Sequence, residues 1–135
     1  MLTPQAGKVV LDTSAVVRHF RQQASLDVLL SQADEIILPH VALGELLYGA
    51  FNADKKWREE TLNQVNLFSS AVTIAYPTEN TVKAYATTRL DLKKRGSPIP
   101  DNDIWIAAIA LQSSLPLYAN DNHFEHVKGL DYIKV

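Results

Sequence analysis

The sequence contains no cysteine and no long hydrophobic run, and both absences narrow the kinds of protein that it can encode. Without cysteine there is no disulfide framework, no thiolate metal site and no cysteine nucleophile. The longest unbroken apolar run, from Ile104 to Leu111, is far shorter than the ~18 residues of a membrane-spanning helix. The first ten residues, MLTPQAGKVV, lack the basic-then-apolar layout of a secretory signal. We therefore expect a cytoplasmic protein with no membrane partner.

An excess of positive charge is also lacking, because 13 basic residues stand against 15 acidic ones and the net charge is -2. A protein that binds nucleic acid through phosphate contacts alone is usually more basic than this. If the partner is a nucleic acid, either a local basic patch or a bound cation must attract it.

Repeats, low-complexity tracts and linkers rich in Gly, Ser or Pro are absent as well. Hydrophobic residues make up 47% and charged residues 21% of the chain, a balance that is typical of globular proteins. We therefore predict a single domain that spans residues 1–135.

What the sequence does contain is an alternation of short apolar runs with longer amphipathic segments. The apolar runs predict strands at 8–12, 35–39, 71–76, 115–120 and 131–135. The segments between them predict helices at 14–32 (broken near Gln22–Ser25), 40–51, 54–70, 78–95 and 103–113. Apolar strands that alternate with helices indicate a parallel sheet covered on both faces. The expected fold class is α/β, a three-layer α/β/α sandwich with a central, mostly parallel sheet.

Solvated positions explain ten of the 15 acidic residues, and the other five are Asp12, Glu45, Asp101, Asp103 and Asp121. Asp12 ends the first predicted strand, and Asp121 follows the fourth. Both are therefore expected at the carboxyl edge of the sheet, where ligands bind in such folds. Taken singly, each of these two residues could instead cap the helix that follows it.

The other three acids stand in apolar segments. Glu45 lies within LPHVALGELLYGAF, where a carboxylate must be paired, protonated or bound to a cation, unless it faces solvent on a narrow polar strip. Asp101 and Asp103 flank Asn102 in front of an apolar helix. One of the two can cap that helix and the other needs a different role, but the periodicity alone does not say which is which.

Carboxylates gathered at one edge repel one another, so their charged forms are costly unless a cation lies among them. Oxygen ligands of this kind suit Mg²⁺ or Mn²⁺. Such an ion lowers the pKa of a bound water and can clamp phosphoryl oxygens during in-line displacement. It would also attract a phosphodiester to a protein that is acidic overall.

Four segments of this sequence resemble the four acidic motifs of PIN-domain nucleases, in the same order and spacing. They are VLDTSAVV, HVALGELLYGA, IPDNDIWIAAIAL and LYANDNHFEHVKGL, and the resemblance extends from about Val9 to Leu130. The sequence is most similar to the VapC-type toxins of toxin–antitoxin pairs. The resemblance implies a Mg²⁺-dependent endoribonuclease that acts on RNA, forms a homodimer and is silenced by a cognate antitoxin protein.

Carried over residue by residue, the resemblance implies that Asp12, Glu45, Asp103 and Asp121 form the catalytic acidic cluster. Asp12 and Asp103 would be the principal metal ligands, and Glu45 and Asp121 would complete the site directly or through water.

Two further residues are expected to support this cluster. Ser14 matches a position that commonly holds a small polar residue near the metal. Asp101 falls two positions before the family's third acid, so it is assigned a helix-capping or supporting role. One departure is Ala119, where the family often has Thr or Ser. The expected loss of a hydrogen bond at this position affects the assignment of Asp121 more than that of the other acids.

The segment RLDLKKRG concentrates basic residues just before the third acidic motif. Arg89, Lys93, Lys94 and Arg95 could hold the RNA backbone, although a solvated helix end also explains them. Arg18 and Arg21 are a second candidate for the same role. The four histidines, His19, His40, His123 and His126, show no zinc spacing, and the tryptophans and tyrosines are expected in the core or at an interface.

Rival interpretations fit the sequence less well. Phosphatases of the haloacid dehalogenase type need an Asp two residues after the first one, where this chain has Ser14, and receiver domains need an acidic pair that KVV does not provide. The remaining alternative is a catalytically idle PIN-like module that binds RNA or a protein partner. The presence of all four family acids argues against that alternative, and a Mg²⁺ titration would separate the two.

Overall fold

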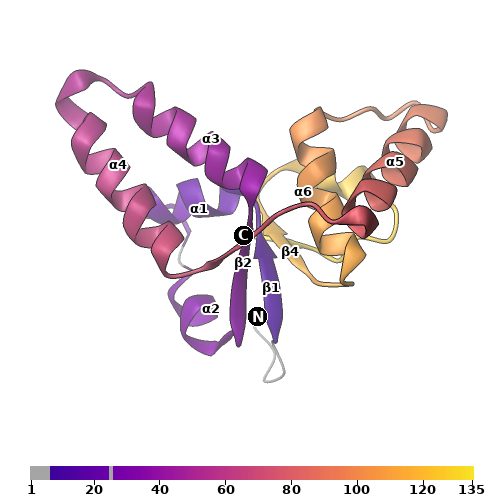
Figure 1. Ribbon diagram of the computed structural model, residues 1–135, viewed down its shortest axis with the longest axis horizontal. Coiled ribbons are helices and arrows are strands. Elements are labelled where there is room, and N and C mark those ends of the chain that lie inside the picture. The colour runs from indigo at the N-terminus through magenta and orange to yellow at the C-terminus, as the bar shows by residue number, and fades with distance from the viewer. Residues whose placement is uncertain (1–6, 25) are drawn as a thin grey trace.

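The computed structural model describes residues 7–24 and 26–135, and its centre is one five-stranded sheet (Figure 1). The strands are β1 Lys8–Leu11, β2 Glu35–Pro39, β3 Thr73–Ala75, β4 Leu117–Ala119 and β5 Tyr132–Lys134. Their order across the sheet is β3-β2-β1-β4-β5, and every neighbouring pair is parallel. All five predicted strands are present; β2 has the predicted bounds, and the other four are slightly shorter than the apolar runs that predicted them.

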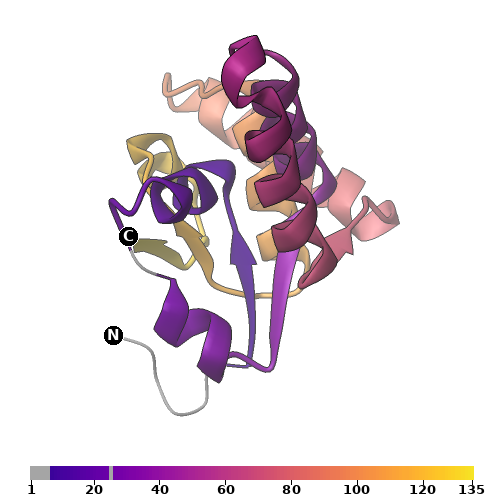
Figure 2. The ribbon, with the colours of Figure 1, turned by 90° about the vertical axis from the view of Figure 1, so that its left-hand side faces the viewer.

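Helices cover both faces of this sheet. They are α1 Thr13–Phe20, α2 Asp27–Gln32, α3 His40–Phe51, α4 Lys55–Ser70, α5 Glu79–Lys94 and α6 Asp101–Gln112, with the 3₁₀ helix η1 at Asn122–His126. Helices α1 to α4 lie on one side of the strands and α5 and α6 on the other (Figures 1 and 2). Right-handed crossovers explain this division, because the chain crosses the sheet in one direction from β1 to β3 and in the other from β3 to β5. The predicted three-layer α/β/α sandwich is confirmed.

The core forms where the central strand meets the helices. Val9, Val10 and Leu11 of β1 are at most 1% exposed, as expected for a strand with neighbours on both sides and helices on both faces. On α6, Ala107 and Ala110 are fully buried. Their small side chains let α6 pack closely between β1 and α5. This packing explains the apolar run that follows the third acidic motif.

The long predicted helix at 14–32 is two helices in the structure, because the chain turns sharply between α1 and α2. Gln22 has a positive φ of 57°, and the backbone N–H of Leu26 donates to Nδ1 of His19 at 3.1 Å. The expected break near Gln22–Ser25 is therefore present at Gln22, whereas Ser25 lies outside the described residues.

The ends of α5 and α6 follow local chemistry. The backbone N–H of Thr78 donates to Oγ1 of Thr81 at 2.9 Å at the start of α5, and Gly96 has a φ of 70° just after the end of this helix. Helix α6 begins at Asp101 rather than at the predicted residue 103. The carbonyl oxygen of Pro100 starts this helix by accepting from the N–H groups of Asp103 and Ile104 at 3.1 and 3.3 Å.

Among the described residues, no helix combines the length and the apolar character needed to cross a bilayer.

Two leucines on α5 test the contribution of its buried face to stability. Leu92 is 1% exposed and Leu90 is 51% exposed on the same helix. Leu92→Ala should lower the free energy of unfolding by about 2–5 kcal/mol, because it leaves a cavity in the packed interior. Leu90→Ala should change it by about 0.5 kcal/mol or less. Urea denaturation measures both values, and equal losses would contradict the packing described for α5.

Candidate active site

Four acidic side chains from separate elements line one hollow at the carboxyl edge of the sheet. Asp12 directly follows β1, Asp121 follows β4 by two residues, Glu45 lies on α3, and Asp103 lies in the first turn of α6. All four line the same hollow of about 360 Å³. The structure therefore brings together the four acids that the motifs single out, although the chain separates Asp12 from Asp121 by most of its length.

Asp12 is the most deeply placed acid, with an exposed fraction of 3%. Its Oδ2 accepts hydrogen bonds from the backbone N–H of Ser14, at 3.1 Å, and from the Ser14 hydroxyl. The Ser14 oxygen in turn accepts from the backbone N–H of Asn120 at 2.8 Å. Ser14 thus links the ends of β1 and β4, and this is the supporting position that the resemblance implies. Ala119 is fully buried in β4 and adds no hydroxyl there.

Burial and crowding raise the pKa values of two of these acids. The pKa of Asp12 is raised to about 6, mainly because burial disfavours the charged form; the Ser14 hydrogen bonds lower it, and the charges of Asp103 and Glu45 raise it. The pKa of Asp103 is raised for the same first reason, and the charges of Asp121 and Glu45 add to the effect. The charges of neighbouring carboxylates therefore contribute to the raised pKa values of Asp12 and Asp103, as expected where several acids share one site.

Glu45 is held on the α3 side of the hollow. Its Oε1 accepts a hydrogen bond of 2.7 Å from the hydroxyl of Thr13, which begins α1. The side chain is half-buried and faces the hollow, rather than lying on a solvated strip of α3. Among the described residues, no Lys or Arg forms an ion pair with Asp12, Glu45, Asp103 or Asp121.

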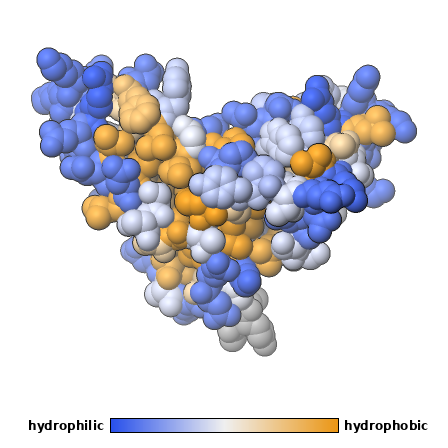
Figure 3. Space-filling model, viewed as in Figure 1, coloured by the Kyte–Doolittle hydropathy of each residue, from blue (hydrophilic) through white to orange (hydrophobic). Residues whose placement is uncertain are grey.

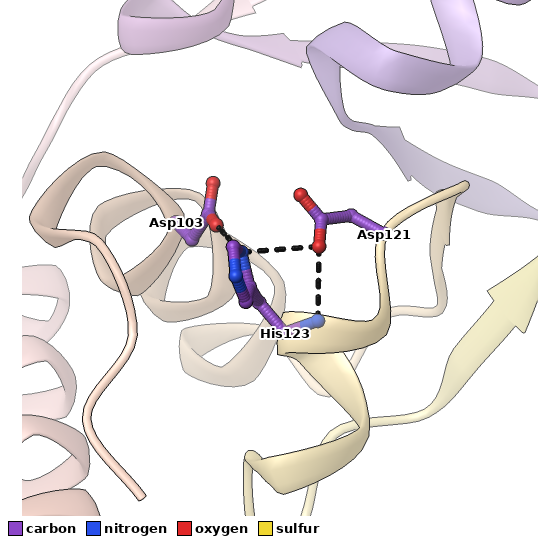
Figure 4. Close-up of side chains that lie close together, drawn as sticks. All are labelled: Asp103, Asp121 and His123. Carbon is purple, nitrogen blue, oxygen red and sulfur yellow. Dashed lines mark hydrogen bonds and ion pairs between the residues drawn. The ribbon is translucent and has the colours of Figure 1, made fainter.

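His123 joins this cluster, although the spacing of the histidines assigned it no role. Its Nδ1 lies 2.9 Å from Oδ2 of Asp103 and 3.0 Å from Oδ1 of Asp121 (Figure 4). The backbone N–H of His123 also donates to Oδ1 of Asp121 at 2.9 Å, because Asp121 caps η1. One potential ligand atom from each of these three residues lies within 4.8 Å of the others. The signal in the sequence is a histidine two positions after the fourth acid.

Asp101, for which a helix-capping or a supporting role was expected, does not cap α6. Pro100 occupies the N-cap position of α6 and no side chain caps this end, because the helix begins at Asp101 itself. The Asp101 carboxylate accepts a hydrogen bond from the hydroxyl of Tyr85 on α5 and lies 3.6 Å from Nη1 of Arg89. It does not line the hollow of the four acids.

The predicted basic patch lies away from the acidic hollow. Arg89 and Lys93 line a separate groove with Asp101, between α5 and the start of α6. Arg95 pairs with Asp91 at 2.7 Å and donates to the backbone oxygen of His126, and Lys94 is exposed at the end of α5. None of these four cations lines the acidic hollow, whereas Arg18 and Arg21 on the α1 side do line it.

The chemistry of this donor set fits a divalent cation. The hollow offers several carboxylate oxygens, and burial, helped by the charges of neighbouring acids, raises the pKa values of Asp12 and Asp103. Carboxylate oxygen ligands match the preferences of Mg²⁺ and Mn²⁺. The residues placed to hold such an ion are Asp12, Glu45, Asp103 and Asp121, with His123 between the last two.

The raised pKa of Asp12, at about 6, makes the stability of the metal-free protein depend on pH. Between pH 4 and pH 6 the folded state retains a proton that the unfolded chain has lost, so the free energy of unfolding falls as pH rises. The cost of charged Asp12 reaches at most about 3 kcal/mol near pH 7. Asp12→Asn removes this cost, so the variant should gain stability relative to the parent as pH rises from 4 to 7.

Chemical denaturation at several pH values in EDTA measures this difference. Asp91→Asn is the matched control, because the ion pair with Arg95 lowers the pKa of Asp91. The control should lose stability relative to the parent as pH rises through 4, which is the opposite sign. A difference between Asp12→Asn and the parent that stays constant with pH would contradict the buried, charge-crowded position of Asp12.

Comparisons with known proteins agree with this geometry. Residues 9–130 match the model of the PIN domain family, the range expected from the four motifs. Ribonuclease VapC1 of Haemophilus influenzae strain R2866 is 30% identical over 128 residues, which cover 91% of this chain and 94% of the relative. Both matches span nearly the whole chain.

Solved structures agree as well. VapBC-5 of Mycobacterium tuberculosis, a member of the VapBC family of toxin–antitoxin systems, superposes with a TM-score of 0.76 and 26% identity, covering 95% of this chain and 97% of that one. VapBC2 of Rickettsia felis, solved with a DNA fragment from its promoter, gives a TM-score of 0.84 at 22% identity, with 95% and 98% coverage, and shares the fold. The chain therefore belongs to the PIN-domain family, and within it to the VapC branch.

Proposed function

We propose that this protein is a divalent-metal-dependent endoribonuclease, the toxin of a type II toxin–antitoxin pair, which hydrolyses RNA phosphodiester bonds. The observation that carries the proposal is the convergence of Asp12, Glu45, Asp103 and Asp121 on one hollow, without a Lys or Arg paired to any of them among the described residues. The relatives support the choice of substrate, because they are named ribonucleases.

The bound ion is proposed to be Mg²⁺ or Mn²⁺, held principally by Asp12 and Asp103. When bound, such an ion lowers the pKa of a water molecule and stabilises the charge that develops on phosphoryl oxygens. Asp12 is held by Ser14, and Glu45 is held by Thr13, so their carboxylates are oriented before any ligand arrives. His123 is a positioning residue, since its Nδ1 lies between Asp103 and Asp121.

The same site explains how a protein that is acidic overall can bind RNA. A net charge of -2 and an acidic hollow would repel RNA, but a divalent ion in the hollow offsets the negative charge and supplies a cation where the phosphodiester must bind. Contacts of a metal ion with phosphate oxygens carry no sequence information. Selection of a particular RNA must therefore depend on other surfaces of the protein.

Two protein partners are proposed, a cognate antitoxin and a second copy of this chain. VapBC-5 of Mycobacterium tuberculosis belongs to a family of toxin–antitoxin systems. Large apolar side chains are exposed on α3 and α4, including Tyr48 at 69%, Phe51 at 60% and Leu67 at 73%. Hydrophobic residues also gather in the centre of the face shown in Figure 3. Surfaces of this kind mark sites that another protein covers.

Two acids in the first turn of α6 provide the sharpest test of the active site. Asp103→Asn should reduce the cleavage of total RNA in Mg²⁺ by at least about 100-fold, because it removes a proposed ligand of the ion. Asp101→Asn is the matched control, since it makes the same change two residues away, outside the hollow. This control should cleave RNA at close to the parent rate. Gel analysis of the RNA fragments measures both, with circular dichroism to show that each variant is folded.

Two results would contradict the proposal. If Asp103→Asn cleaves as fast as the parent, the site is misassigned. If the parent cleaves no RNA in Mg²⁺ or Mn²⁺ and the ions leave its melting temperature unchanged, the chain is an idle PIN-like module that binds RNA or protein. A single-stranded DNA substrate in the same assay shows whether cleavage is confined to RNA.

A further inference from the structure

Two arginines extend from the acidic hollow along α1. Arg18 and Arg21 line the same hollow as the four acids, and Arg21 also borders the neighbouring groove between α1, α3 and α4. They are the cations that line this hollow among the described residues. Positive charge therefore lies directly beside the place where an ion and a phosphodiester are proposed to bind.

The two guanidinium groups remain available to a ligand. Neither Arg18 nor Arg21 forms an ion pair with an acid of the described chain, although four carboxylates line the same hollow. Arg18 makes one hydrogen bond, from Nη2 to the carbonyl oxygen of Gln23 at 3.3 Å. Its Nε is buried and has no hydrogen-bond partner in the structure. A buried, unpartnered donor of a charged group needs a hydrogen-bond partner, either an ordered water or a bound ligand.

The spacing along α1 places these side chains in a row that begins at the metal site. Ser14, Arg18 and Arg21 are separated by four and three residues, so they share one face of the helix. Along the helix axis, Arg18 lies ~6 Å and Arg21 ~10 Å beyond Ser14. Ser14 contacts Asp12, so the row leads away from the proposed metal ligands. An RNA strand whose scissile phosphate lies at the metal can pass its neighbouring phosphates over this row.

We propose that Arg18 and Arg21 bind the RNA backbone phosphates that flank the scissile phosphate, an inference that rests on the proposed ribonuclease function. The planar guanidinium group donates two parallel hydrogen bonds to phosphate oxygens and stays charged at every relevant pH. Contacts with phosphate are independent of base sequence, so the two arginines contribute affinity and register. They are substrate-binding residues and take no part in the proton transfers of hydrolysis.

The basic patch at the end of α5 is the competing candidate for this role. Arg89 lies 3.6 Å from the carboxylate of Asp101, and Arg95 lies 2.7 Å from that of Asp91. Both cations are therefore already partly neutralised by acids of the same chain. The groove that Arg89 and Lys93 line is also separate from the hollow that holds the four proposed catalytic acids. The α1 row is favoured by both charge and position.

The test measures cleavage and binding with Arg18→Gln and Arg21→Gln in the full chain. In Mg²⁺, each variant should raise the KM for RNA about tenfold with a smaller change in kcat, because the lost contact lies outside the reacting group. RNA binding is measured in an Asp103→Asn background by the fluorescence anisotropy of a labelled, mixed-sequence single-stranded RNA. The slope of log affinity against log salt should fall by about 0.7 for each lost phosphate contact.

Three further variants separate charge from structure. Arg58→Gln on α4 is the matched control, because Nη2 of Arg58 donates to a backbone carbonyl at 3.2 Å as Arg18 does, but away from the hollow. It should leave KM and the salt slope unchanged, and so should Arg89→Gln. Arg18→Lys keeps the charge and should restore most of the salt slope but only part of the affinity. If Arg18→Gln fails to fold, Arg21→Gln decides the question, since Arg21 is exposed.

The outcomes distinguish this inference from the function on which it rests. If the parent cleaves RNA while both arginine variants retain its KM and its salt slope, the α1 row is wrong and the ribonuclease proposal stands. If Arg89→Gln alone weakens binding, the RNA follows the α5 patch and the inference is overturned. If the parent cleaves no RNA in Mg²⁺ or Mn²⁺, the ribonuclease proposal fails and this inference fails with it.

Discussion

The burial of carboxylates that lie close together is the constraint on which the rest of this structure depends, because burial disfavours their charged forms and their charges repel one another. Burial raises the pKa of Asp12 to about 6 and also raises that of Asp103, and each acid feels the charge of Glu45. Within the described chain, His123 is the ionisable group that lies between two of the acids, and no Lys or Arg is paired to the four. An arrangement that costs stability by itself is explained if a divalent cation neutralises it.

The topology of the sheet explains how distant residues meet. The strand order places β1 beside β4, so Asp12 and Asp121 leave the sheet next to each other, and the hydroxyl of Ser14 joins the two strand ends. Helices α3 and α6 belong to opposite layers (Figure 1), and Glu45 on α3 and Asp103 on α6 line the same hollow. Packing of the small residues of α6 against β1 fixes the position of Asp103. The core of the fold therefore determines the geometry of the site.

The sequence predicts the layers and the convergence of the acids because both follow from short-range patterns. Apolar runs predict strands, and a parallel sheet aligns their carboxyl ends. The start of α6 was misplaced because three consecutive polar residues can each cap a helix, and the structure uses the backbone of Pro100 instead. His123 escaped prediction because its contacts with Asp103 depend on the 3₁₀ turn after β4. Arg18 and Arg21 line the acidic hollow without an ion pair to any acid of the described chain. This feature depends on tertiary contacts, which the composition of the sequence does not reveal.

Calorimetric titration of the full chain with Mn²⁺, in buffers of different ionisation enthalpy, tests the central claim most directly. A carboxylate must lose its proton to bind a metal ion, so binding is coupled to proton release. Because the pKa of Asp12 is about 6, saturable binding at pH 6 should release part of a proton, and this release should nearly vanish by about pH 7.5. Titrations that show no saturable Mn²⁺ binding at either pH would contradict the account of this hollow as a metal-dependent active site.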